Sequence, residues 1–180
     1  MLALMSLTAS AQRTAYGERQ LNIEGHASPV PSFGAALSYG QYLLNTFWEG
    51  GVTADNYIKL HEMDGRYGNL RVEGYGAFFY RIYGTRNRQL SVYAGGDLFL
   101  GFEFLDPFKQ LTQPGYQSLL NEGNKAHQFI YGVSPRAEAE FFVSRDIALV
   151  LRMRVPVTLN TQIRSNLVDI VGALGVRYNF

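Results

Sequence analysis

Apolar and polar residues alternate along most of the chain. Between Ile147 and Leu159, for example, Leu149, Leu151 and Met153 alternate with smaller or charged residues such as Arg152. This period of two is typical of β-strands that have one apolar and one polar face. Eight such segments follow one another, and we expect strands at residues 19–27, 33–43, 46–54, 69–84, 89–104, 128–141, 147–159 and 168–180.

The connections between these segments differ in length in a regular way. Those after the second, fourth and sixth segments are short, whereas residues 55–69 and 106–126 form long connections and the remaining two are intermediate. Outer-membrane barrels have short periplasmic turns and longer outside loops. With eight strands, both chain ends lie on the periplasmic side of such a barrel.

The polar face of the segments carries charges of both signs, eight acidic and six basic side chains in all. A soluble sandwich or barrel would show these charges to water, whereas a membrane barrel turns its apolar rows to lipid and its polar rows inward. The apolar rows reach about ten residues and carry large aromatic side chains near their ends, which favours the membrane barrel. We therefore predict an all-β fold, an eight-stranded antiparallel up-and-down transmembrane β-barrel with a filled polar interior. Its predicted lumen charge network is Glu73, Arg81, Asp97, Arg136, Glu138, Arg152, Arg154, Asp169 and Arg177.

The two ends of the sequence also fit an exported barrel. Residues 1–11 form a short apolar stretch that ends in the small-x-small pattern Ala9-Ser10-Ala11, which predicts a cleaved signal peptide and a barrel over residues 12–180. At the other end, alternation continues to Phe180. The last strand must pair with the first, because unpaired backbone groups in lipid each cost several kcal/mol.

Composition narrows the possible functions. The 16 basic and 15 acidic residues leave a net charge of +1, which provides no excess of positive charge for nucleic-acid binding. The absence of cysteine excludes disulfides and thiolate metal sites. We find no phosphate loop, no GxSxG and no HExxH motif, so we predict no catalytic residue, cofactor or metal.

Two weak candidates for chemistry remain, and for both we favour an ordinary polar loop. Residues 61–64, His-Glu-Met-Asp, could be imagined as a cation site. Ser118 and His127 share the longest connection and are residue types that a lipid hydrolase would use.

Pro135 and Pro156 interrupt the sixth and seventh segments at nearly the same height. Proline cannot donate a hydrogen bond to a strand ladder. We favour a pair of β-bulges near the outer rim over the alternative, a lateral opening between the two strands.

Several segments together resemble a known family. The stretches QRTAYGERQLNIEG, FIYG, SRDIALVLRMR and GALGVRYNF are similar to the conjugal transfer protein TraO family of conjugative transposons. The resemblance implies a component of a conjugation apparatus, related to type IV secretion, in the bacterial outer membrane. Its role would be structural, and its partners would be outer-membrane lipid, the barrel assembly machinery and other conjugation proteins, without direct nucleic-acid contact. Tyr178 and Phe180 resemble the assembly signal of outer-membrane barrels.

Two functions of other classes stay open at this point. One is a small outer-membrane enzyme that modifies lipids, and the other is a surface adhesin that binds through its outer loops.

Overall fold

The computed structural model describes residues 17–29, 32–61, 65–84, 89–105, 127–161 and 168–180. Within these ranges the chain forms nine β-strands. No helix that could span a membrane occurs in the described ranges. The strands are β1 (Arg19–Ser28), β2 (Ser32–Leu43), β3 (Thr46–His61), β4 (Gly65–Gly84), β5 (Leu90–Leu105), β6 (His127–Phe142), β7 (Ile147–Arg154), β8 (Val157–Leu159) and β9 (Val171–Asn179).

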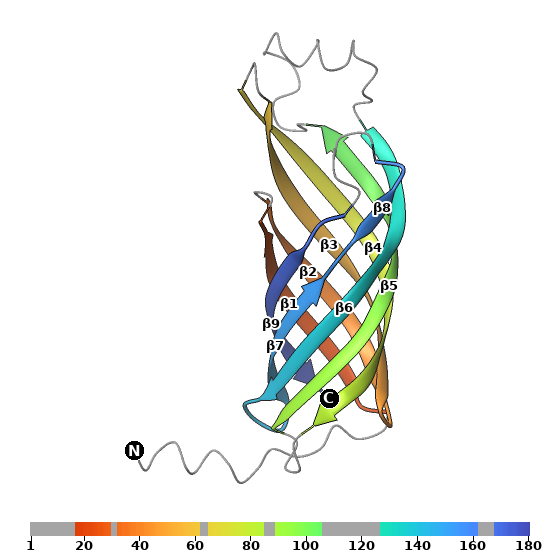
Figure 1. Ribbon diagram of the computed structural model, residues 1–180. Coiled ribbons are helices and arrows are strands. Elements are labelled where there is room, and N and C mark those ends of the chain that lie inside the picture. The colour runs from red at the N-terminus through yellow and green to blue at the C-terminus, as the bar shows by residue number, and fades with distance from the viewer. Residues whose placement is uncertain (1–16, 30–31, 62–64, 85–88, 106–126, 162–167) are drawn as a thin grey trace, which may run out of the picture.

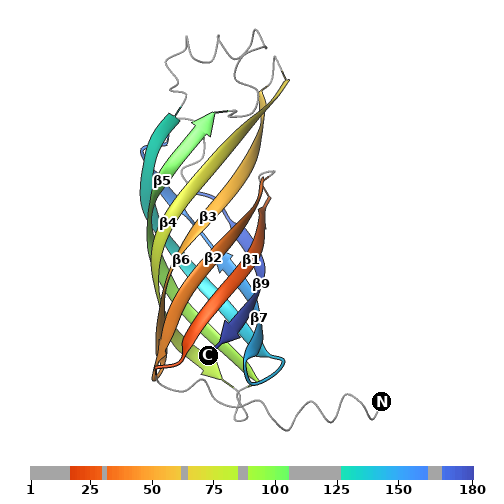
Figure 2. The same cartoon turned by 180° about the vertical axis from the view of Figure 1, so that it is seen from behind.

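The strands close into a single antiparallel barrel (Figures 1 and 2). Neighbours in sequence pair from β1 to β6, and β9 then pairs with both β1 and β7. Both β7 and β8 pair with β6, so they are two parts of one barrel strand and the barrel has eight. The predicted eight-stranded up-and-down barrel is confirmed.

The apolar rows face outward. Phe33, Phe78, Leu98 and Leu174 are all more than half exposed, whereas the intervening polar residues are buried. In water this arrangement would expose a continuous hydrophobic surface, but a lipid bilayer covers it favourably. The predicted aromatic residues near the row ends are also exposed: Phe33, Trp48, Tyr80, Phe102, Phe141 and Tyr178.

One expected loop is mostly strand. We predicted a connection over residues 55–69, but β3 continues to His61 and β4 begins at Gly65. The two strands stay in register from Thr46↔Tyr80 to His61↔Gly65. As a result β3 and β4 rise well beyond the end of the β1–β2 hairpin (Figure 1). The predicted connection at 106–126 lies outside the described residues.

The prediction of bulges at the two prolines is wrong. Arg136 pairs with Arg154 and Val133 with Val157, three residues further on each strand, so no residue is inserted between them. Each proline keeps the hydrogen bond that its carbonyl group can accept. Val155 N donates to Pro135 O at 3.0 Å, and Asp169 N donates to Pro156 O at 3.3 Å. The ladder therefore loses one donor at each proline without a change of register.

Candidate functional site

The centre of the lumen is organised around Glu49, which β3 directs inward. Three arginines reach its carboxylate from the other side of the barrel: Arg152 Nη1 at 2.8 Å, Arg136 Nη1 at 3.3 Å and Arg177 Nη2 at 3.7 Å. The Glu49 side chain is fully buried, so these contacts have little competition from water. Glu49 thus joins β3 to β6, β7 and β9.

A second group of carboxylates completes this cluster. Glu138 lies 2.5 Å from Arg152 Nη2 and 2.7 Å from Arg177 Nη1. Arg177 also donates to Glu140 at 3.0 Å, and Tyr42 donates to the same carboxylate. The guanidinium groups of Arg152 and Arg177 therefore each contact several carboxylates. These contacts offset the free-energy cost of removing the charged groups from water.

A further set of ion pairs lies in the half of the barrel nearer the long connections. Arg154 Nη2 lies 3.0 Å from Glu73, which also pairs with Arg71. Arg71 Nη1 lies 3.8 Å from Glu103, and Thr161 donates to Glu103 at 2.8 Å. Near the end of β1, His26 Nε2 lies 2.5 Å from Asp55.

Aromatic rings fill the space between the charges. The buried apolar cluster of the described residues consists of Ala77 and six aromatic residues: Tyr42, Phe47, Tyr75, Phe79, Tyr93 and Phe99. All five buried arginines stack on one of these rings: Arg136 lies 4.2 Å from the Tyr75 centroid, Arg71 and Arg177 5.0 Å from Phe99 and Phe47, Arg152 5.4 Å from Phe79 and Arg154 5.6 Å from Phe99. Charge and ring layers together fill the lumen of a barrel whose eight strands leave room for little more.

Eight of the nine residues in the predicted charge network are buried in the lumen. Six of these take part in the ion pairs above, and a seventh, Asp97, forms an ion pair with Arg136. The eighth, Asp169, accepts hydrogen bonds from Ser28 Oγ and Ile170 N at 2.8 Å. Arg81, the ninth residue of the predicted network, lies outside the buried group. It is half-buried at the short-turn end and donates to Asn45 Oδ1 at 2.5 Å. The register between β4 and β5 shifts between Arg81 and Tyr83, which disturbs the alternation at this end.

Asp55 is a lumen residue that the sequence reasoning missed, because it was assigned to a loop. With Asp55 added and Arg81 removed, the described lumen holds nine buried carboxylates and five guanidinium groups rather than eight and six. The inward position of Phe47 and Phe79 was also missed. Phe47 is followed by the outward-facing Trp48, and Phe79 lies between the outward-facing Phe78 and Tyr80. The two faces of the strand therefore do not differ in polarity at these positions.

The remaining predicted residues lie elsewhere. Tyr178 and Phe180 are exposed on the lipid-facing side, and their rings stack at 5.9 Å. The expected signal peptide at 1–11, Ser118 and residues 62–64 lie outside the described part of the chain, and His127 is exposed at the start of β6. Among the described residues no group of three or more His, Asp or Glu side chains could hold a metal ion.

A family model for the conjugative transposon protein TraO matches residues 31–180. The chain belongs to the TraO family. The family match covers β2 to β9, including β2 to β5, which contain none of the resembling segments. The first resembling segment, residues 12–25, precedes it. A comparison with curated proteins gave no match.

The TraO-family barrel is also similar to solved outer-membrane-type barrels. Neisserial surface protein A has a TM-score of 0.56 at 14% identity, with 92% of this chain and 96% of that chain covered. Ail of Yersinia pestis has a TM-score of 0.54 at 12% identity, with 92% and 100% covered. The N-terminal β-barrel domain of Pseudomonas aeruginosa OprF has a TM-score of 0.53 at 12% identity, with 92% and 98% covered. At these identities the likeness establishes the fold alone.

Proposed function

We propose that this protein is a non-enzymatic component of a conjugative transfer apparatus in the bacterial outer membrane. The observation that carries the proposal is the TraO family match over residues 31–180. The outward apolar surface and the buried charges support the membrane location. The predicted signal peptide would direct the chain to that membrane.

The filled lumen supports a role in anchoring or contact rather than in transport. A channel requires an open path along the lumen. In this barrel, buried arginine and aromatic side chains occupy the lumen between Tyr42, near the short-turn end, and Glu103, near the opposite end. Contacts with other transfer proteins would then be made through the loops and turns at the two ends of the barrel. These partners would belong to a machine related to type IV secretion.

The test is the frequency of conjugative transfer after deletion of the gene from its element. We expect transfer to fall to background and to return when the gene is supplied in trans. Fractionation of the envelope should place the protein in the outer membrane. Normal transfer by the deletion strain would overturn the proposal.

The same strains test the enzymatic alternative. Lipid extracted from cells with and without the protein should have the same acyl-chain composition. A change in that composition would point to a lipid-modifying enzyme instead.

A further inference from the structure

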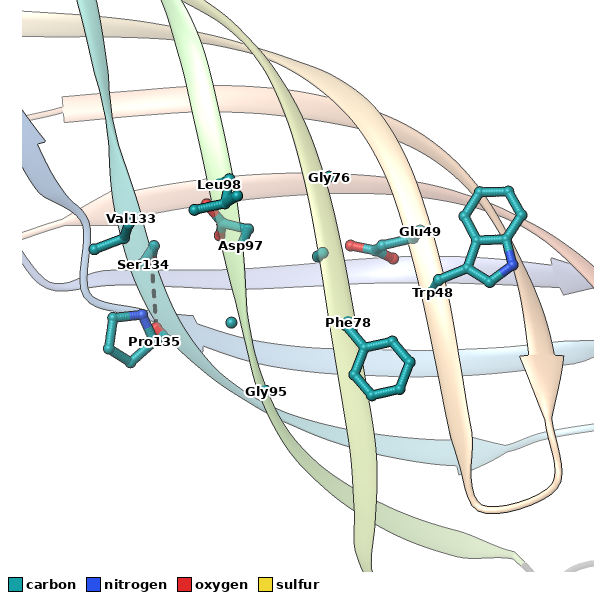
Figure 3. Close-up of a pocket in the computed structure, with 12 residues that line it drawn as sticks. Trp48, Glu49, Gly76, Phe78, Gly95, Asp97, Leu98, Val133, Ser134 and Pro135 are labelled. Carbon is teal, nitrogen blue, oxygen red and sulfur yellow. Dashed lines mark hydrogen bonds between the residues drawn. The ribbon is translucent and has the colours of Figure 1, made fainter.

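Three arginines and five carboxylates in the middle of the lumen form one connected network of ion pairs. The arginines are Arg136, Arg152 and Arg177, and the carboxylates are Glu24, Glu49, Asp97, Glu138 and Glu140. Figure 3 shows Glu49 on β3 and Asp97 on β5, on either side of β4. If every carboxyl group were ionised, the network would carry two more negative charges than positive ones.

This excess of negative charge lies in a part of the barrel from which water is excluded. None of the eight side chains belongs to a residue that is more than 6% exposed. An ionised carboxylate that is buried without a cation of its own is strongly unfavourable, and such a group takes up a proton instead. The charge count therefore predicts that at least one carboxyl group of the network is protonated.

Glu140 has the least access to positive charge among these carboxylates. Arg177 Nη1 lies 3.0 Å from Glu140, but the same nitrogen atom lies 2.7 Å from Glu138. Glu138 also has a second arginine, because Arg152 Nη2 lies 2.5 Å from it. Glu140 thus shares a single nitrogen atom with a carboxylate that is closer to that atom.

The two other carboxylates with one arginine each are better served. Glu24 also accepts a hydrogen bond from Asn22 Nδ2 at 3.2 Å. Asp97 binds Arg136 Nε, whereas Glu49 is reached by a different nitrogen atom of that guanidinium group. Neither carboxylate has to share its nearest donor nitrogen in the way that Glu140 does with Glu138.

The second oxygen atom of Glu140 is the place for a proton. Glu140 Oε1 accepts hydrogen bonds from the Tyr42 hydroxyl and from Arg177. Glu140 Oε2 has no hydrogen-bonding partner among the described residues and is closed off from water. In a carboxylate this oxygen would share the negative charge without a donor, whereas a proton makes it a neutral hydroxyl group, which is less costly to bury. A proton also needs no extra space.

The surroundings of Glu140 are compatible with a neutral acid. The side chains that face it are Tyr42 from β2, Ser91 and Tyr93 from β5, Glu138 from β6, Val150 from β7 and Arg177 from β9. Phenol groups are neutral at neutral pH. Arg177 and Glu138 are therefore the one cation and the one anion in this set, and their charges compensate each other.

We infer that Glu138 and Glu140 bind one proton between them at neutral pH and that this proton resides on Glu140. Glu138 stays ionised between Arg152 and Arg177. Glu140 is a neutral carboxylic acid that accepts the hydrogen bond from Tyr42. The inference concerns the lumen of the folded barrel and does not depend on a role in conjugation.

The bound proton makes folding depend on pH. Carboxyl groups of the unfolded chain release their protons near pH ~4.3, the ordinary value for glutamate, whereas the folded barrel keeps the proton on Glu140. At neutral pH the folded state therefore binds one proton more than the unfolded state, so stability falls as the pH rises. One proton corresponds to a roughly tenfold fall of the folding equilibrium constant per pH unit.

Carbon-13 NMR reads the protonation state of Glu140 directly. The folded protein is labelled at the glutamate carboxyl carbons and studied in detergent micelles, and each resonance is assigned through its own backbone amide. A carboxylic acid and a carboxylate have different carbon shifts. At neutral pH we expect the shift of a neutral acid for Glu140 and that of a carboxylate for Glu138. A carboxylate shift for Glu140 would overturn the inference.

Glu140→Gln tests the pH dependence, because glutamine resembles the neutral acid but has no carboxyl proton to release. Between about pH 6 and pH 8 the folding equilibrium constant of the unaltered protein should fall ~100-fold more than that of the variant. Urea unfolding in lipid vesicles measures this constant through the fluorescence of Trp48, the single tryptophan of the chain.

Glu73→Gln is the matched control. Glu73 is also fully buried, but it contacts two arginines, Arg71 and Arg154, so it is ionised in the folded and in the unfolded state. Glu73→Gln should be less stable than the unaltered protein and should keep its pH dependence. Equal pH dependence of Glu140→Gln and the unaltered protein would overturn the inference, and so would an equal loss of pH dependence in both variants. If Glu140→Gln does not fold, the carbon shift of Glu140 in the unaltered protein decides the matter.

Discussion

Arg152 Nη1 lies 2.8 Å from Glu49 Oε1, and the two residues belong to strands on different walls of the barrel. In the sheet order, β2, β1 and β9 separate β3 from β7. The ion pair therefore crosses the lumen instead of following a strand ladder. Together with Arg136 and Arg177 it braces the wall of β3 against the wall of β6, β7 and β9.

The first prediction concerns this brace. Arg152 also lies 3.1 Å from Glu24. Arg152→Met keeps much of the side-chain length but removes one positive partner from each of Glu49, Glu138 and Glu24. Because a buried charge without its partner is costly, the free energy of unfolding should fall by about 3–5 kcal/mol. Urea unfolding in lipid vesicles, followed by Trp48 fluorescence, measures this change.

A double variant separates the charge effect from lost packing. Adding Glu138→Gln to Arg152→Met removes one of the carboxylates that lost one of its two arginine partners, so the double variant should be more stable than the sum of the two single changes predicts. A cost below about 1 kcal/mol for Arg152→Met would place the pair in the range of exposed ion pairs and contradict the assignment.

Arg81→Ala provides the second prediction and a comparison with Arg152. Arg81 is half-buried at the short-turn end, and its guanidinium group donates a hydrogen bond to the neutral Asn45 side chain. Interactions of this kind are screened by water, so the loss should stay below about 1 kcal/mol in the same unfolding assay. A loss as large as that of Arg152→Met would show that Arg81 belongs to the buried network after all.

The fold could be predicted from the sequence because lipid-facing apolar residues and lumen-facing polar residues alternate along each strand of a membrane barrel. Arg152 and Arg154 stand between Leu151, Met153 and Val155, so each side chain is assigned to lipid or lumen by its neighbours. The same alternation identified seven of the residues that form the buried ion pairs. The alternation does not predict which carboxylate pairs with which arginine, because the two partners come from strands that are distant in sequence.

The failures have particular physical causes. Arg81 has the inward parity of Phe79 and of its buried pairing partner Tyr93, but it stands at the short-turn end of β4, directly before a register shift, and is only half-buried there. Asp55 was assigned to a loop because the Asn, Asp and Gly residues around positions 55–69 resemble turn residues, yet pairing with β4 continues to His61. Phe47 and Phe79 could not be placed by polarity, because both faces of their strands are aromatic there.

The third prediction tests the expected assembly signal. Phe180→Ala should reduce the amount of folded barrel in the outer membrane, but it should change the stability of purified, folded protein little. The two backbone hydrogen bonds between Phe180 and Arg19, both 3.0 Å, do not depend on the ring. Phe180 as a whole is 56% exposed. The fraction of protein that migrates as folded on unheated gels measures assembly in cells.

Phe33→Ala is the matched control for Phe180→Ala. Phe33 is 58% exposed on the same lipid-facing surface, so its loss removes a similar apolar contact without touching the last strand. An equal drop in assembly for both variants would mean that the terminal ring has no special role.

The last prediction concerns a glycine that the lumen requires. Gly132 pairs with Phe99 across β5 and β6, and a Cβ atom there would overlap Val157 O and lie 2.5 Å from Phe99 Cζ. Phe99 cannot move away freely, because the guanidinium groups of Arg71 and Arg154 lie 5.0 and 5.6 Å from its ring. Gly132→Ala should therefore lower the free energy of unfolding by about 1–3 kcal/mol through overpacking. Gly25→Ala, which meets open space, should stay within about 0.5 kcal/mol of the unaltered protein in the same urea assay. Equal effects at the two positions would contradict the packing of Phe99 over Gly132.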